Sequence, residues 1–180
     1  MFLSGCFTVG AENVTGERGD QSLAFGGIDI EIIGPNPRQF PTRLRFFDVI
    51  DVSTQERTRV MVEAETQTFS VSLLPGHYEV IRLQFNEGPF RAEVSVTMRF
   101  HIPANQLTYL GTWQLKVDTP RTQRMVRMEI PEKNPNWGAV FEADPILKGK
   151  FVVNSFPQLS THKTRLFVVS PIPKVPYFYR

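Results

Sequence analysis

Residues 91–102 alternate strictly between apolar and polar side chains, and this pattern constrains the fold more than any other feature. Apolar side chains occupy every second position, and polar side chains occupy the positions between them: Ala92, Val94, Val96, Met98, Phe100 and Ile102 against Arg91, Glu93, Ser95, Thr97, Arg99 and His101. Successive side chains of a strand point to opposite faces. The pattern therefore predicts a strand with one face in a hydrophobic core and the other in water.

A second alternation follows over residues 107–117, after a connecting turn at Pro103-Ala104-Asn105. The apolar set is Leu107, Tyr109, Gly111, Trp113, Leu115 and Val117, and Leu110 is the one apolar residue on the polar side. Trp113 is therefore expected in the core.

Further strands are expected at 28–33, 44–49, 59–62, 69–73, 78–85, 125–130, 151–156 and 165–169, and Pro75-Gly76 is expected to turn the chain into 78–85. Many short strands separated by turns indicate an all-β fold, a single antiparallel β-sandwich of about 8–9 strands. The chain has 180 residues, of which 41% are hydrophobic, enough for one core, and we assign the sandwich domain to residues 23–180.

One short helix is expected near residues 136–144, capped by Asn136 and ended by Pro145. Trp137, Val140 and Phe141 would share one face of it. That face is expected to close an open end of the sandwich, and the alternative is an exposed aromatic platform.

Leu3-Ser4-Gly5-Cys6 resembles the lipobox at which bacterial lipoproteins are cleaved and acylated, and Cys6 is the only cysteine. The resemblance implies that residues 1–5 end a signal peptide and that Cys6 carries lipid. Only Met1 and Phe2 precede the box, so we expect the rest of the signal upstream of Met1. Phe7, where an Asp would favour inner-membrane retention, implies an outer-membrane anchor facing the periplasm.

The two ends of the chain differ from the sandwich in composition. Residues 6–22 have no sustained periodicity and are interpreted as the lipidated N-terminus and a flexible spacer. Prolines precede Tyr177-Phe178-Tyr179 at the other end. This tail either packs along the sandwich or, together with Trp137, presents a binding surface.

Charge and cysteine content exclude several classes of protein. The net charge of +2 and the absence of a Lys/Arg run argue against a nucleic-acid partner. One cysteine excludes an intrachain disulfide and a cysteine-based zinc site. No run approaches the roughly 18 apolar residues of a membrane span, so the predicted membrane contact is the N-terminal lipid alone.

Candidate catalytic residues are sparse, and we expect neither an enzyme nor a cofactor. His77, His101 and His162 have no second histidine or carboxylate at the spacing of a metal motif, and we interpret them as surface residues. Asp48 and Asp51, close to Glu56, could act as paired carboxylates or bind calcium, but Asp51–Gln55 has the composition of a polar turn.

Residues 73–80, Leu-Leu-Pro-Gly-His-Tyr-Glu-Val, resemble the L-P-x-G-x-Y turn of carboxypeptidase-regulatory-like and other transthyretin-like β-sandwiches. Residues 100–105, followed by Tyr109-Leu110-Gly111, resemble a pattern found in bacterial lipoproteins with such a domain. The resemblance covers residues 66–117. It implies a fold and no activity.

Three functions remain open on the sequence. The first is a lipid-anchored, non-enzymatic envelope protein with an interaction or structural role and a protein partner. The second is a module that binds envelope glycan or lipid, suggested by the aromatic tail and by seven Lys/Arg against three acidic residues after position 130. The third is an enzyme whose site is assembled from residues on separate strands, and a pocket holding two of the histidines or the Asp48/Asp51 pair would favour it.

Overall fold

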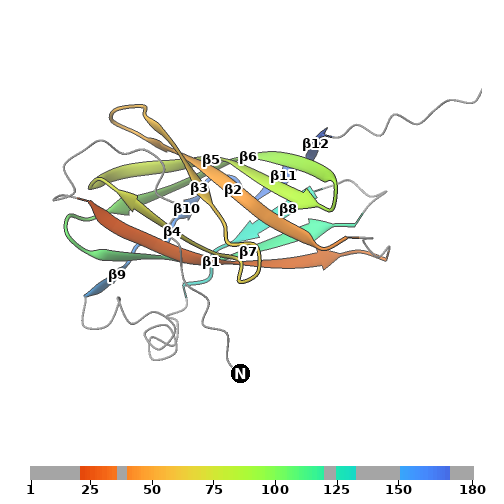
Figure 1. Cartoon of the computed structure of the whole chain (residues 1–180), viewed down its shortest axis with the longest axis horizontal. Coiled ribbons are helices and arrows are strands. Elements are labelled where there is room, and N and C mark those ends of the chain that lie inside the picture. Colours follow the sequence, from red (N-terminus) through yellow and green to blue (C-terminus); the bar gives the residue numbers. More distant parts are fainter. Residues whose placement is uncertain (1–20, 36–39, 120–124, 133–150, 171–180) are drawn as a thin grey trace, which may run out of the picture.

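The computed structural model describes residues 21–35, 40–119, 125–132 and 151–170, which form two packed β-sheets (Figure 1). The first sheet has the strand order β11-β8-β7-β1-β4, with β9 also paired to β7, and is called the β1 sheet below. The second has the order β10-β6-β5-β2-β3, with β12 also paired to β6, and is called the β5 sheet.

The strands are β1 (Ser22–Ile33), β2 (Thr42–Asp51), β3 (Arg57–Met61), β4 (Thr68–Leu73), β5 (Gly76–Glu87), β6 (Phe90–Ile102), β7 (Leu107–Asp118), β8 (Met125–Glu129), β9 (Val152–Asn154), β10 (Gln158–Leu159), β11 (Lys163–Arg165) and β12 (Phe167–Ser170). The described part of the chain is thus all-β, and the predicted β-sandwich is confirmed. Most pairs are antiparallel, but β1 runs parallel to β7, as does β9. The strands beyond the expected 8–9 are short pieces after residue 151.

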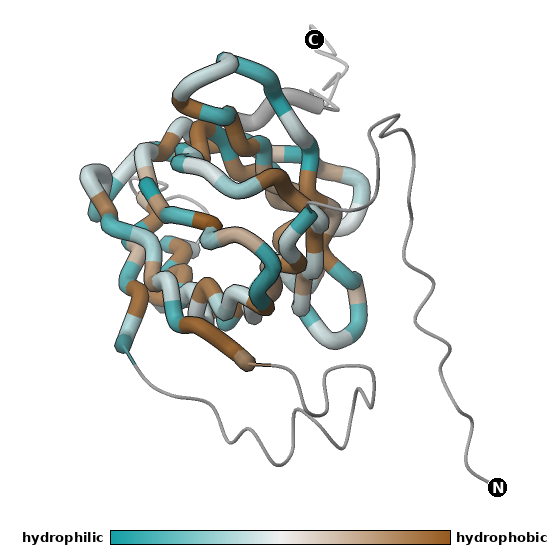
Figure 2. Tube along the Cα trace, turned by 90° about the vertical axis from the view of Figure 1, so that its left-hand side faces the viewer, coloured by the Kyte–Doolittle hydropathy of each residue, from teal (hydrophilic) through white to brown (hydrophobic). Residues whose placement is uncertain are grey.

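The alternation in residues 91–102 is confirmed along β6. All six apolar side chains are buried, and the six polar ones are exposed or half-buried. Hydrophobic and hydrophilic residues interleave in the same way along much of the trace in Figure 2. At the centre of the core, the rings of Phe47, Phe69 and Trp113 lie with centroids 4.8–5.0 Å apart. Trp113 is fully buried, as predicted.

Both turns expected around prolines carry the chain from one sheet to the other. Pro75 and Gly76 connect β4 of the β1 sheet to β5, and residues 103–105 connect β6 to β7. The buried Tyr78 donates its hydroxyl to the carbonyl of Leu74, 2.8 Å away, across the first turn. The two strongest alternations of the sequence therefore face each other across the core.

The single face predicted for residues 107–117 is wrong in its first half. A register shift against β1 lies opposite Gly26, and Gly111 has a φ of 84°. The extra residue reverses the side-chain alternation, as a β-bulge does. Leu110 consequently joins Trp113 in the core, while Tyr109 instead contacts Phe25 and Phe156, at centroid distances of 5.5 and 6.2 Å.

Residues 152–170 close one side of the sandwich by pairing alternately with the two sheets. β9 pairs with β7, β10 with β6, β11 with β8 and β12 with β6. The segment therefore links the two sheets along the side where β6 and β8 would otherwise present open edges. The predicted helix near 136–144, Trp137, the aromatic tail Tyr177–Phe178–Tyr179, Cys6 and residues 7–20 of the spacer lie outside the described residues. The predicted end of the spacer at residue 22 is wrong, because Ser22 is buried as the first residue of β1, where pairing with β4 orders the chain.

Candidate functional site

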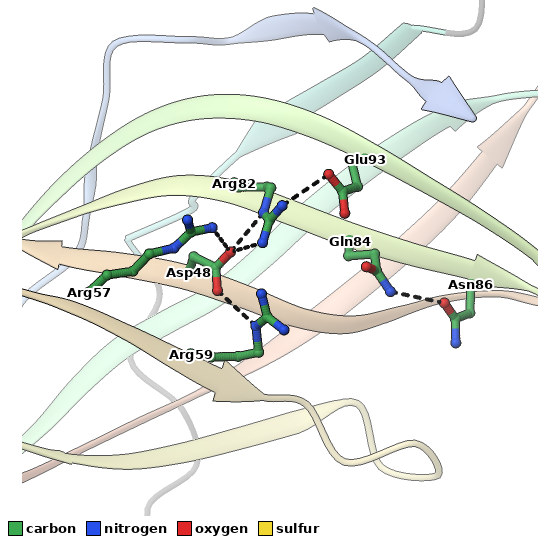
Figure 3. A network of polar contacts seen from close by, with 7 residues as sticks. All are labelled: Asp48, Arg57, Arg59, Arg82, Gln84, Asn86 and Glu93. Atoms are coloured by element: carbon green, nitrogen blue, oxygen red, sulfur yellow. Dashed lines mark hydrogen bonds and ion pairs between the residues drawn. The ribbon is translucent and has the colours of Figure 1, made fainter. Parts of the chain in front are cut away.

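The outer face of the β5 sheet carries three arginines that converge on one buried carboxylate, Asp48 (Figure 3). Arg59 donates from Nε to Asp48 Oδ1 at 3.0 Å, and Arg57 donates to Oδ2. Arg82 reaches Oδ2 from Nε at 2.7 Å and from Nη2 at 2.6 Å, and its Nη1 lies 3.2 Å from Glu93. We call these five residues the arginine cluster.

The cluster is assembled from four neighbouring strands: β2, β3, β5 and β6. Asp48 lies opposite Arg59 on β3 and opposite Arg82 on β5 in the strand register. A register shift between Leu44 and Phe46 reverses the alternation of β2. Because of it, Leu44 and Phe47 both belong to the core, and the buried Phe46 and Asp48 lie on the other face.

Phe46 forms an apolar floor beside Asp48. The guanidinium carbon of Arg59 lies 3.8 Å from the centre of the Phe46 ring, and that of Arg82 lies 5.6 Å away. Both distances permit cation–π attraction. The ring and the carboxylate together hold the arginine side chains in one arrangement, so their positively charged groups are organised in advance of any ligand.

The electrostatics of the cluster follow from its burial and its hydrogen bonds. Burial by itself would raise the pKa of Asp48, but hydrogen bonds from Arg59, Arg57 and Arg82 outweigh it and hold that pKa below its usual value. Burial would lower the pKa of Arg82, and the bond to Asp48 raises it instead. Asp48 and Arg82 therefore both carry charge at neutral pH.

The cluster has one unbalanced positive charge, because three arginines face two carboxylates. The side chains of Arg57 and Arg59 are 46% and 50% exposed, whereas that of Asp48 is 1% exposed. Arg59 donates to Asp48 through Nε, and half of its side chain is exposed. Such a surface can accept a carboxylate or a phosphate, the groups that guanidinium donors match best.

Asp51 is the last residue of β2, three positions after Asp48, and does not join it. Its Oδ1 accepts hydrogen bonds from the backbone and hydroxyl of Ser53 and from the backbone of Thr54, at 2.6–3.0 Å. These bonds, led by the Ser53 hydroxyl, lower the pKa of Asp51. The interpretation of residues 51–55 as a polar turn is confirmed, and the two aspartates do not form a paired acid–base site.

The three histidines separate into a pair and a single residue. His77 and His101 lie directly opposite each other on β5 and β6, with ring centroids 4.7 Å apart, and both are exposed. His162 is exposed beside β8 in the other sheet, where its carbonyl accepts from the Met128 amide. Each histidine is on the surface, as predicted, but the proximity of two of them was not anticipated. In the described ranges, no group of three or more His, Cys, Asp or Glu side chains is arranged to hold a metal ion.

The sequence contains one signal for the arginine cluster, a charged residue inside an apolar strand. Asp48 interrupts an otherwise apolar stretch of β2, Phe46–Ile50, and a charged residue in such a stretch is rarely buried without a partner. The partners could not be identified, because Arg82 lies 34 residues away.

Comparisons with known proteins do not assign a family to this chain. No protein-family model matches the chain, and searches of curated proteins and solved structures found no match. Within the described ranges there is also no helix of the length and apolar character needed to cross a membrane.

Proposed function

We propose that this protein is a lipid-anchored, non-enzymatic β-sandwich of the bacterial cell envelope that binds an acidic envelope protein through the arginine cluster. One observation carries the binding part: three partly exposed guanidinium groups are held by a buried aspartate and a buried ring. Groups organised in advance lose little conformational entropy on binding, which favours affinity.

The anchoring part of the proposal is supported by the lipobox-like residues 3–6 and by the single cysteine at its end. Two or more acyl chains at Cys6 would give stable attachment, whereas one chain gives only marginal binding. Mass spectrometry of the mature N-terminus from envelope fractions tests this. A mass matching acylated Cys6 is expected, and an unmodified Met1 or Cys6 would refute it.

The binding part is tested with a double variant, Arg57→Gln with Arg59→Gln, which leaves Arg82 on Asp48. Arg99→Gln is the matched control, because Arg99 is an exposed arginine on the same sheet face that pairs only with Glu79 among described residues. Affinity purification from detergent-solubilised envelopes is expected to recover the same acidic protein with the wild type and the control. Recovery that is unchanged with the double variant would contradict the proposal.

A phosphate-bearing lipid or glycan of the envelope is the second candidate ligand. The same guanidinium groups favour it, since arginine pairs with phosphate as well as with carboxylate. Binding to purified lipopolysaccharide, reduced in the double variant and unchanged by Arg99→Gln, would support this candidate over a protein partner. Tyr177→Ala and Tyr179→Ala test the contribution expected from the aromatic tail.

A further inference from the structure

The exposed histidine pair on the β5 sheet has the geometry of a chelating site. His77 and His101 are register partners on adjacent antiparallel strands. Directly opposite residues have Cβ atoms about 4.5–5.5 Å apart. The ring centroids are 4.7 Å apart and the ring planes are inclined by 45°, so neither ring blocks the other from turning a nitrogen toward a shared point.

The backbone around the pair is held from both sides. The amide of Val52 donates to the carbonyl of His77 at 2.9 Å. On the opposite side, the Ser155 hydroxyl donates to the carbonyl of His101 at 2.7 Å and accepts from its amide at 3.3 Å. Each imidazole therefore extends from a fixed backbone, and binding requires only side-chain rotation.

We propose that His77 and His101 together bind one transition-metal ion of the kind that prefers imidazole, such as Zn²⁺ or Cu²⁺. Imidazole nitrogen coordinates Zn²⁺ at about 2.0–2.1 Å, and two rings on facing strands can reach one ion from opposite sides. Water completes the coordination. The neighbouring Glu79 is already paired with Arg99 at 2.6 Å.

The structure also explains why binding would be reversible. Two protein ligands leave an open coordination sphere, unlike the closed four-ligand sites that serve as structural zinc centres. The ion would lie on a solvent-facing sheet surface and would link β5 to β6, which are already paired. This inference is independent of the lipid anchor and of the arginine cluster.

Isothermal titration calorimetry of the full chain with ZnCl₂ tests the proposal. Every protein in the series carries Cys6→Ser and no histidine tag, so that no other strong ligand competes. His162→Asn is the matched control, because His162 is also exposed but lies just before β11, beside the other sheet. The parent and the control are expected to bind one Zn²⁺ with equal affinity. His77→Asn and His101→Asn are each expected to weaken Zn²⁺ binding by roughly 100-fold. A second ligand linked to the first raises affinity by about this factor, and each variant removes one of the two ligands.

Two further measurements keep the result unambiguous. The thermal unfolding midpoint of each variant without metal shows whether it is folded, and added Zn²⁺ is expected to raise the midpoint of the parent and the control only. Mg²⁺ is expected to have no effect, because it prefers oxygen ligands. The proposal is overturned if the parent does not bind at about 1 mM Zn²⁺, if both histidine variants bind as the parent does, or if Mg²⁺ competes equally.

Discussion

The two outer faces of the sandwich are built differently. The face of the β5 sheet is polar, and it carries the arginine cluster and the histidine pair. The corresponding part of the β1 sheet carries aromatic residues: Tyr109 on β7 contacts Phe25 on β1 and Phe156 from the returning chain. One sheet therefore exposes charged groups in a fixed arrangement, while part of the other, around Tyr109, contacts Phe156 of the returning chain.

This difference explains why the alternation in residues 91–102 predicted the buried face of β6 correctly, whereas the alternation in residues 107–117 did not do so for β7. The outer residues of β6 meet solvent, so the period of two in its sequence reports which face is buried. Both faces of β7 are buried near residues 107–110, so an apolar residue there does not identify the core side. The bulge at Gly111 then reverses the alternation without leaving a clear mark in the sequence.

The largest effect is expected on the polar face, from Asp48→Asn. This change keeps the side-chain volume but removes the negative charge that three guanidinium groups share, although Arg82 keeps its pair with Glu93. We expect the free energy of unfolding to fall by about 2–4 kcal/mol. This loss is smaller than that for breaking a fully buried ion pair, because the arginines are partly exposed. Urea denaturation measures it.

Glu129→Gln is the control for Asp48→Asn, since Glu129 forms an exposed pair with Lys116 at 3.2 Å. Loss of this ion pair is expected to lower the free energy of unfolding by less than about 1 kcal/mol. Equal losses in the two variants would show that the arginine cluster contributes no more than an ordinary surface ion pair.

The next effect concerns the close approach of β1 to the core and to β7. A Cβ atom on Gly26 would lie 2.6 Å from the Phe69 ring and 2.7 Å from the Gly111 carbonyl, whereas one on Gly27 would lie 3.3 Å from the Thr112 hydroxyl. Gly26→Ala is therefore expected to lower the free energy of unfolding by about 1–3 kcal/mol through overpacking. Thermal or urea unfolding measures the change.

Gly27→Ala is the matched control, and its effect is expected to be smaller because a side-chain hydroxyl can shift where a backbone carbonyl cannot. If both alanine variants were equally stable, the glycine at position 26 would not be required by the packing of Phe69.

The smallest effect is the acid dependence of stability. Because the pKa of Asp48 in the folded protein lies below the free value of 3.8, its contribution is present above pH 3.8 and is lost as the pH falls further. The wild type is therefore expected to lose more stability than Asp48→Asn between about pH 5 and pH 2. Asp51, whose pKa is also lowered, contributes equally to both proteins. Parallel pH profiles from urea denaturation would contradict the assignment.

The candidate sites were less predictable than the fold because they depend on pairings between distant residues. Asp48 is recognisable as a charge in an apolar strand, but its partners Arg57, Arg59 and Arg82 are identified only once β2 is known to lie between β3 and β5. His77 and His101 likewise become neighbours through the register of β5 with β6. The periodicity of a single strand reports neither the order of the strands in the sheet nor the register between them.

The sequence by itself determined most of the long strands, the turns at Pro75-Gly76 and residues 103–105, and the all-β class, since these depend on local alternation and on turn residues. Only the tertiary structure decided which sheet each strand joins, where the bulges reverse the alternation, and which charged side chains meet. The reason is physical. Face and turn are properties of a few adjacent residues, whereas register is set by the packing of two sheets against one core.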